Sequence, residues 1–143
     1  MYDDILVPTD GSPAATGAVE HAIDLAAVTG GRIHALYVVD TATATAVPEA
    51  QWVTVEEFLE DAGEEALATV RELAAKSDVG IQTVIRHGGP HEQITAYAGE
   101  AAIDLIVMGT HGRSGLDRVL LGSVTEKVIR HADVPVLVKR IEQ

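Results

Sequence analysis

The chain has 143 residues and a net charge of −12, and 47% of its residues are hydrophobic. Nucleic acid and anionic membranes would repel this charge, so we expect neither as a partner. The absence of cysteine excludes disulfides and cysteine-based metal or redox sites. The length is typical of one domain, 1–143, and no run approaches the roughly 18 apolar residues of a membrane span, so we expect a cytoplasmic protein.

The surface is also expected to be unusually acidic, because the chain contains 22 acidic and only 10 basic residues. An acidic, lysine-poor surface is typical of proteins from a high-salt cytoplasm, where counterions screen the repulsion between like charges. Halophilic origin is therefore one interpretation, and an ordinary acidic mesophilic protein is the other.

The N-terminal part of the chain is predicted to form a strand, a helix and a second strand. An apolar run at 2–7 predicts the first strand. Ser12 can then cap a helix that has Pro13 at its first position, and Gly30 ends this helix. The nearly continuous apolar run at 32–39 predicts the second strand.

The next segment, 40–53, has no clear period, and we expect a loop over the open end of the sheet. Residues 54–57 read TVEE, a capping box that predicts the start of a long helix. The other side of this helix is strongly acidic, which is typical of a solvated surface. Its expected buried face consists of Leu59, Ala62, Ala66, Val70 and Leu73.

Three more strands and two helices are expected in the rest of the chain. The strands are predicted at 80–87, 105–108 and 134–139, and a helix runs from Ser123 to about His131. Between the third and fourth strands lies a short helix, and its expected buried residues are Ile94, Tyr97, Ala98 and Ala101.

Strands that alternate with helices predict an α/β fold, in which a parallel sheet has helices on both faces. The pattern alone does not determine the strand order. In open sheets of this kind, ligands bind at the carboxyl ends of the strands, where the winding direction reverses.

The stretch from 104 to 125 combines a buried strand, a glycine-rich loop and a helix start. Gly122 precedes Ser123, a plausible helix N-cap, and such a helix start offers backbone N–H groups and a positive dipole end to an anion, usually phosphate. Three known motifs do not fit. A P-loop needs lysine after its last glycine, a dinucleotide fingerprint belongs in the first strand–helix unit, and Leu116 breaks a nucleophile elbow.

The spacing of Gly109, Gly112, Gly122 and Ser123, with His111 inside it, resembles the ATP-binding signature of the universal stress protein family. The resemblance extends along the whole chain, from 5–12 (ILVPTDGS) to 134–138 (VPVLV). It implies a Rossmann-like fold, similar to the adenine nucleotide alpha hydrolases, with a single open five-stranded parallel sheet of order 3-2-1-4-5. The loops after strands one and four then open at the same switch point.

By the same resemblance, a set of residues would bind ATP. Asp10 would contact the nucleoside or hold Mg²⁺ together with the phosphates, and the backbone of Val38 or Val39 would hold adenine. Arg113 and Arg118 are the cations of the loop, and each is either a phosphate ligand or a solvated charge. The full set is Pro8, Thr9, Asp10, Val38, Val39, Met108, Gly109, His111, Gly112, Arg113, Gly122, Ser123, Val124 and Thr125.

Three functions remain open at this point. The resemblance favours an ATP-binding, homodimeric stress-response module whose two copies pair through the strand at 134–139. The alternatives are a slow Mg²⁺-dependent ATPase that uses Asp10, and an interaction protein of the same fold that binds no nucleotide. No catalytic residue is assigned. His87 and His91 flank a Gly-Gly-Pro turn, which excludes a helical i,i+4 metal pair.

Overall fold

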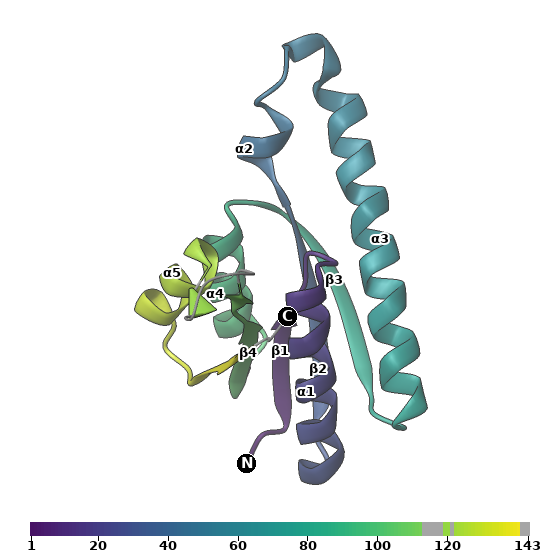
Figure 1. Ribbon diagram of the computed structural model, residues 1–143, viewed down its shortest axis with the longest axis vertical. Coiled ribbons are helices and arrows are strands. Elements are labelled where there is room, and N and C mark those ends of the chain that lie inside the picture. The colour runs from purple at the N-terminus through teal and green to yellow at the C-terminus, as the bar shows by residue number, and fades with distance from the viewer. Residues whose placement is uncertain (113–118, 121, 141–143) are drawn as a thin grey trace.

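The computed structural model describes residues 1–112, 119–120 and 122–140, with backbone only at 111–112 and 119–120. A five-stranded parallel sheet of order β3-β2-β1-β4-β7 forms the centre of the fold (Figure 1), which confirms the predicted fold class and strand order. The strands of this sheet are β1 (Asp4–Pro8), β2 (Arg32–Asp40), β3 (Ile81–Gly88), β4 (Leu105–Gly109) and β7 (Val136–Lys139). Two further strands, β5 (His111–Gly112) and β6 (Val119–Leu120), pair with each other antiparallel.

Two helices cover each face of the sheet. On one face, α1 (Pro13–Thr29) and α3 (Trp52–Lys76) pack on side chains that include Ile5 and Val7. On the other face, α4 (Pro90–Glu100) and α5 (Ser123–His131) pack on side chains that include Leu6 and Ile106. Because β1 and β4 are buried from both sides, their sequences are continuously apolar rather than alternating. In the described part of the chain, no helix is both long and apolar enough to cross a membrane.

The ends of α1 confirm the signals seen in the sequence. The side chain of Ser12 accepts a hydrogen bond from the backbone N–H of Ala15 at 3.2 Å, and Pro13 is the first helical residue. Gly30 ends the helix with φ of 76°, in the left-handed region that glycine adopts without strain.

The expectation of a loop at 40–53 was wrong. Asp40 accepts a hydrogen bond from the N–H of Ala42 and caps a short helix, α2 (Thr41–Ala44). A 3₁₀ turn, η1 (Glu49–Gln51), leads into α3. The long helix begins at Trp52, before the predicted capping box, and the Trp52 indole N–H donates to the carbonyl of Val47 at 2.8 Å.

The buried face of α3 is also shifted from the predicted one. Of the residues expected there, Val70 is buried, whereas the others are only partly buried. Gly63 belongs to the buried face because it lies against the ring of Tyr37, a contact that hydrophobicity does not reveal. The buried residues are Gly63, Leu67, Val70 and Ala74.

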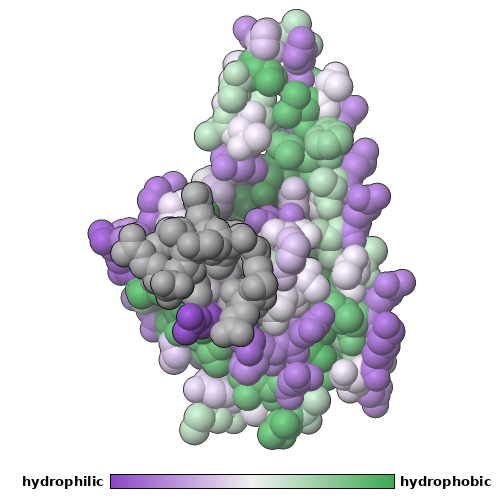
Figure 2. All heavy atoms as spheres, in the orientation of Figure 1, coloured by the Kyte–Doolittle hydropathy of each residue, from purple (hydrophilic) through white to green (hydrophobic). Residues whose placement is uncertain are grey.

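The first half of α3, together with α2 and η1, extends beyond the ends of the strands as an arm, residues 41–62 (Figure 1). Hydrophobic side chains on this arm lie among hydrophilic ones (Figure 2), and Val53 and Phe58 are 69% and 71% exposed.

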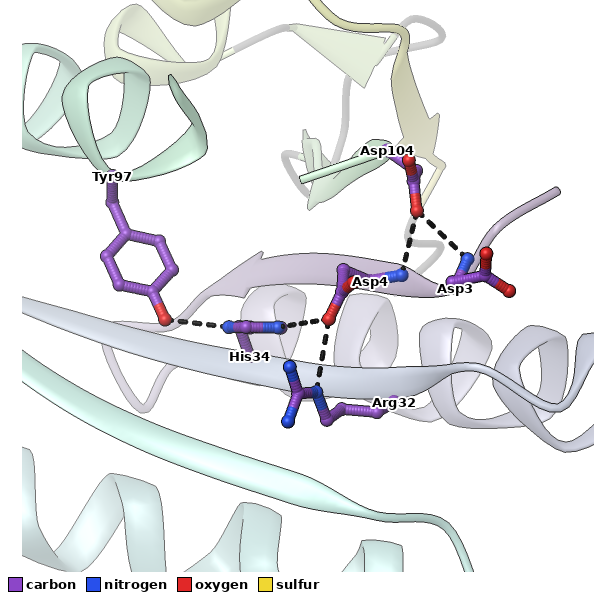
Figure 3. Close-up of polar contacts among 6 residues, drawn as sticks. All are labelled: Asp3, Asp4, Arg32, His34, Tyr97 and Asp104. Carbon is purple, nitrogen blue, oxygen red and sulfur yellow. Dashed lines mark hydrogen bonds and ion pairs between the residues drawn. The ribbon is translucent and has the colours of Figure 1, made fainter. Parts of the chain in front are cut away.

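Polar contacts join residues near the amino ends of the strands (Figure 3). This end of the sheet lies opposite the arm (Figure 1). The Asp104 carboxylate accepts hydrogen bonds from the backbone N–H groups of Asp3 and Asp4. The buried His34 lies between Asp4 and Tyr97, with Nε2 at 2.8 Å from the Asp4 carboxylate and Nδ1 at 2.7 Å from the Tyr97 hydroxyl. The network therefore joins β1, β2 and α4.

Candidate functional site

A pocket of about 420 Å³ opens at the carboxyl ends of β1, β2 and β4. This is the place where the winding of the sheet reverses, since β1 lies between β2 and β4. Ten of the residues predicted for the site line this pocket. They are Pro8, Thr9, Asp10, Val38, Met108, Gly109, Gly122, Ser123, Val124 and Thr125.

The loop after β1 positions Asp10 at the pocket. The N–H of Thr9 donates to the carbonyl of Leu36 in β2, which continues the sheet for one more residue. The Thr9 hydroxyl accepts from the N–H of Gly11, and the Asp10 carboxylate accepts from the N–H of Ser12 at 2.9 Å. Gly11 has φ of 80°, so this tight turn requires glycine. One carboxylate oxygen of Asp10 is thus engaged in the turn.

The start of α5 forms the opposite wall of the pocket. The first helical hydrogen bond runs from the N–H of Glu126 to the carbonyl of Gly122. The N–H groups of Ser123, Val124 and Thr125 therefore lie in the first turn, where a helix offers them no internal partner. Their positive dipole end faces the pocket, and an anion is the guest that such a helix start stabilises.

One expectation about this helix start was wrong. Gly122, not Ser123, occupies the N-cap position, and Ser123 is the first helical residue. Gly122 has φ of −66°, so positive φ is not the reason for glycine here. The Thr125 hydroxyl donates to the carbonyl of Gly109 at 3.4 Å, which ties α5 to the end of β4.

Of the other four predicted residues, Val39 does not line the pocket. The side chain of Val39 is 1% exposed and packs in the core beneath α1 and α3, whereas Val38 faces the pocket. His111 and Gly112 form β5, of which the structure gives the backbone. Arg113, like the second loop cation Arg118, lies outside the described residues.

The sequence reasoning missed several lining residues, of which Asp40 is the most informative. Asp40 is the last residue of β2, so its place at the carboxyl end of a strand was the available signal. Pro90 and Ile94 reach the pocket from α4, and no sequence pattern indicated that this helix would approach the β1 loop.

The charges of the pocket are unbalanced. Asp10 and Asp40 are the charged members of its described lining. A triphosphate would therefore meet two carboxylates, and a divalent cation bound by oxygen atoms would reduce the repulsion between the phosphates and these carboxylates.

Burial, and then the nearby charge of Asp10, raise the pKa of Tyr37.

A second cavity, of about 330 Å³, lies on the other side of the β1 loop, between α1 and α3. Thr9 and Asp10 belong to the linings of both cavities, so they form part of the wall between them.

His87 and His91 have different partners. The Nε2 atom of His87 lies 2.8 Å from a carboxylate oxygen of Glu60, whereas the ring of His91 stacks on that of His131 with centroids 5.5 Å apart.

Comparison with known proteins agrees with this architecture. A model of the Universal stress protein family matches residues 1–140. The chain belongs to the universal stress protein family. It is 42% identical over 139 residues to Universal stress protein MJ0531 of Methanocaldococcus jannaschii, an alignment that covers 96% of this chain and 82% of the relative.

Solved structures of this family share the fold. The structure of MJ0577 superimposes with a TM-score of 0.86 at 31% identity and covers 100% of this chain and 99% of its own. An Archaeoglobus fulgidus universal stress protein in complex with dAMP has a TM-score of 0.69 at 21% identity, covering 96% and 97% of the two chains. Another universal stress protein, in complex with cAMP, has a TM-score of 0.68 at 24% identity, covering 97% of each chain.

Proposed function

We propose that this universal stress protein binds ATP with Mg²⁺ in the pocket between the β1 loop and the start of α5. One observation carries the proposal. Residues of the loop after β1 and residues at the end of β4 and the start of α5, which together resemble the family's ATP-binding pattern, line one pocket at the switch point of the sheet. Complexes of more distant family members with dAMP and cAMP support an adenine nucleotide as the ligand class.

The residues present have complementary roles in this proposal. The N–H groups of 123–125 would receive the phosphates, and the Val38 backbone would hold adenine. Asp10 fits a Mg²⁺ ion held jointly with the phosphates, because Mg²⁺ prefers one or two carboxylates plus phosphate oxygens. That ion would neutralise phosphate charge at a pocket whose described lining contains two aspartates.

We also propose that hydrolysis is slow or absent, so that the protein responds to nucleotide rather than consuming it. In-line phosphoryl transfer needs a group that orients water and a cation that meets the developing charge. The described lining offers no lysine or arginine for the second role.

Calorimetry with ATP, with and without Mg²⁺, tests the binding. Gly122→Val should abolish binding, because it places a bulky side chain where the phosphates must approach the helix start. Gly80→Val is the matched control at the opposite end of the sheet, where an added Cβ comes no closer than 3.8 Å to Arg32. Asp10→Asn should weaken binding mainly when Mg²⁺ is present. If the unmodified protein gives no heat of binding, the site assignment is wrong. If ATP turns over at about 1 s⁻¹, the low end for phosphoryl-transfer enzymes, the sensor role is wrong.

We further propose that two copies pair through β7, the edge strand of the sheet. The carbonyls of Pro135 and Lys139 point to β4, where they accept from Ile106 and Thr110. Because alternate residues of a strand point in opposite directions, the backbone groups of Val136 and Val138 point to the open edge. The backbone N–H that Pro135 lacks would have pointed toward β4. Its absence therefore leaves the outer edge of β7 free to pair with another strand.

Light scattering tests the dimer. We expect twice the 15.1 kDa mass of the chain at micromolar concentration. Val138→Pro should yield monomers, because it removes an outward N–H and leaves the bonds to β4 in place. A monomeric unmodified protein would rule out this assembly.

A further inference from the structure

Outside the candidate pocket, three side chains of the arm and the neighbouring edge strand converge on one point. They are Glu56 and Glu60 of α3 and His87 of β3, and one ligand atom from each lies within 4.8 Å of the others. Both carboxylates approach the same atom. The Nε2 of His87 is 2.8 Å from an oxygen of Glu60 and 3.4 Å from an oxygen of Glu56.

Two regular elements hold these groups in place. Glu56 and Glu60 are four residues apart on α3, so they lie on the same side of the helix, one turn apart. His87 is the last residue but one of β3, and its register with Val39 of β2 is fixed by the sheet. The donors therefore come from a helix and a strand rather than from loops, which favours a defined geometry.

Among the described residues, the ion pairs of Glu56 and Glu60 are both with His87. The sequence contains no lysine or arginine between Arg32 and Arg71, a stretch that includes both glutamates. A protonated Nε2 has one hydrogen and can make one well-aligned bond, so the second carboxylate adds repulsion without a bond of equal quality. A dication at the same point would attract both carboxylates and accept the imidazole lone pair.

We propose that Glu56, Glu60 and His87 bind a divalent transition-metal ion of the zinc type. An imidazole nitrogen with carboxylates suits zinc and its neighbours, whereas calcium and magnesium prefer oxygen ligands alone. Bonds of about 2.0–2.1 Å place tetrahedral ligands about 3.3–3.4 Å apart. The separation of His87 and Glu56 already has this value, and Glu60 would move away from His87 by about half an ångström.

The surroundings leave room for a fourth ligand. The side chains of His87, Glu56 and Glu60 are 40%, 49% and 42% exposed, so water can complete a tetrahedral shell. Three protein ligands and one water form a set that binds zinc in many proteins. The site is distinct from the nucleotide pocket and does not depend on the proposed function.

Metal binding would link the arm to β3 at a point close to the candidate nucleotide pocket. The residue after His87, Gly88, pairs with Asp40, and Asp40 and Pro90 both line the pocket. The ion would thus join the projecting half of α3 to the strand that leads to the pocket rim.

Calorimetric titration of the chelator-treated, nucleotide-free protein with ZnCl₂ tests the proposal, with Co²⁺ absorption as a probe of tetrahedral ligation. We expect one equivalent to bind. His87→Ala and Glu60→Gln should each weaken binding at least tenfold. Glu57→Gln, on the same helix, and His21→Ala, on α1, are matched controls that should leave it unchanged.

Three outcomes would overturn the proposal. The first is no binding to the unmodified protein, and the second is equal binding to the His87→Ala and Glu60→Gln variants. The third is loss of binding in His91→Ala alone, which would assign the metal to the stacked pair of His91 and His131. Circular dichroism checks that each variant is folded, and Glu60→Gln preserves the shape of its side chain if His87→Ala proves unstable.

Discussion

Replacement of Tyr97 by phenylalanine tests whether the buried contact between α4 and β2 stabilises the fold. The carboxylate of Asp4 can only accept, so a neutral His34 holds its proton on Nε2 and presents Nδ1 as an acceptor. The Tyr97 hydroxyl then donates to Nδ1 at 2.7 Å. Burial raises the pKa of Tyr97, which keeps this donor protonated. Phenylalanine preserves the ring, over which Arg86 lies at 5.0 Å, and removes only the hydroxyl.

The expected cost follows from the burial of His34, which is 2% exposed. A buried acceptor left without a partner costs about 1–3 kcal/mol. With an unfolding entropy of about 2.1 cal/mol/K per residue, this cost lowers the melting temperature by about 3–10 °C. Differential scanning calorimetry measures this shift.

Tyr37→Phe is the matched control for this variant. Tyr37 is similarly buried, at 8% exposure, but none of the hydrogen bonds found among the described residues involves its hydroxyl. We expect its removal to change the melting temperature little. If Tyr97→Phe melts within 1 °C of the unmodified protein, the contact with His34 does not contribute to stability and the reasoning is refuted.

Three further predictions concern pH, packing and salt. The hydrogen bond from His34, and then the hydrogen bond and charge of Arg32, hold the pKa of Asp4 below its ordinary value of 3.8. The stabilising contribution of Asp4 is therefore full above that value and is lost as the pH falls through the lowered pKa. Urea unfolding should therefore separate Asp4→Asn from the unmodified protein at pH 6, and the difference should shrink as the pH falls below 3.8. A difference that stays constant on acidification would contradict this. Gly63→Ala should lower the free energy of unfolding by about 1–3 kcal/mol, because its Cβ would lie 2.6 Å from the Tyr37 ring. Gly99→Ala has open space around it and should be neutral or stabilising by up to about 1 kcal/mol. Equal effects of the two substitutions in thermal melts would refute the packing argument. If the net charge of −12 reflects a high-salt cytoplasm, the melting temperature should rise steeply up to about 1 M KCl, where the Debye length is about 3 Å, and a melt indifferent to salt would count against halophilic origin.

The succession of the five central strands and of the four helices that cover the sheet could be predicted because each of these elements carries a local signal. Apolar runs mark the strands, and Ser12, Pro13 and Gly30 mark the ends of α1. The strand order came from the family resemblance rather than from periodicity. The start of α3 could not be predicted from the capping box, because Trp52 begins the helix through a turn and an indole bond to Val47 that depend on the folded arm.

The candidate site was predictable where a residue directly follows a strand or precedes a helix, as Asp10 and Gly122 do. It was not predictable where a residue reaches the pocket from elsewhere, as Ile94 of α4 does. The contact of His34 with Tyr97 joins residues 63 positions apart, and no periodicity reports such a pair. Sequence patterns therefore indicate elements and their ends, whereas side-chain partners across the sheet depend on tertiary packing.

The projecting arm has a consequence for how such a protein can diversify. Residues 41–51 leave the sheet after β2 and lead to the start of α3 at the far end of the arm (Figure 1). Ala44 is buried, but no residue of this segment belongs to the two hydrophobic clusters that flank the sheet. A doubling of the length of such a connection costs only about 0.6 kcal/mol in chain entropy. This segment could therefore lengthen, shorten or accept an inserted peptide while strand order and the β1 loop stay as they are. It is also the position we would choose for grafting a recognition sequence or a fluorescent reporter onto this scaffold.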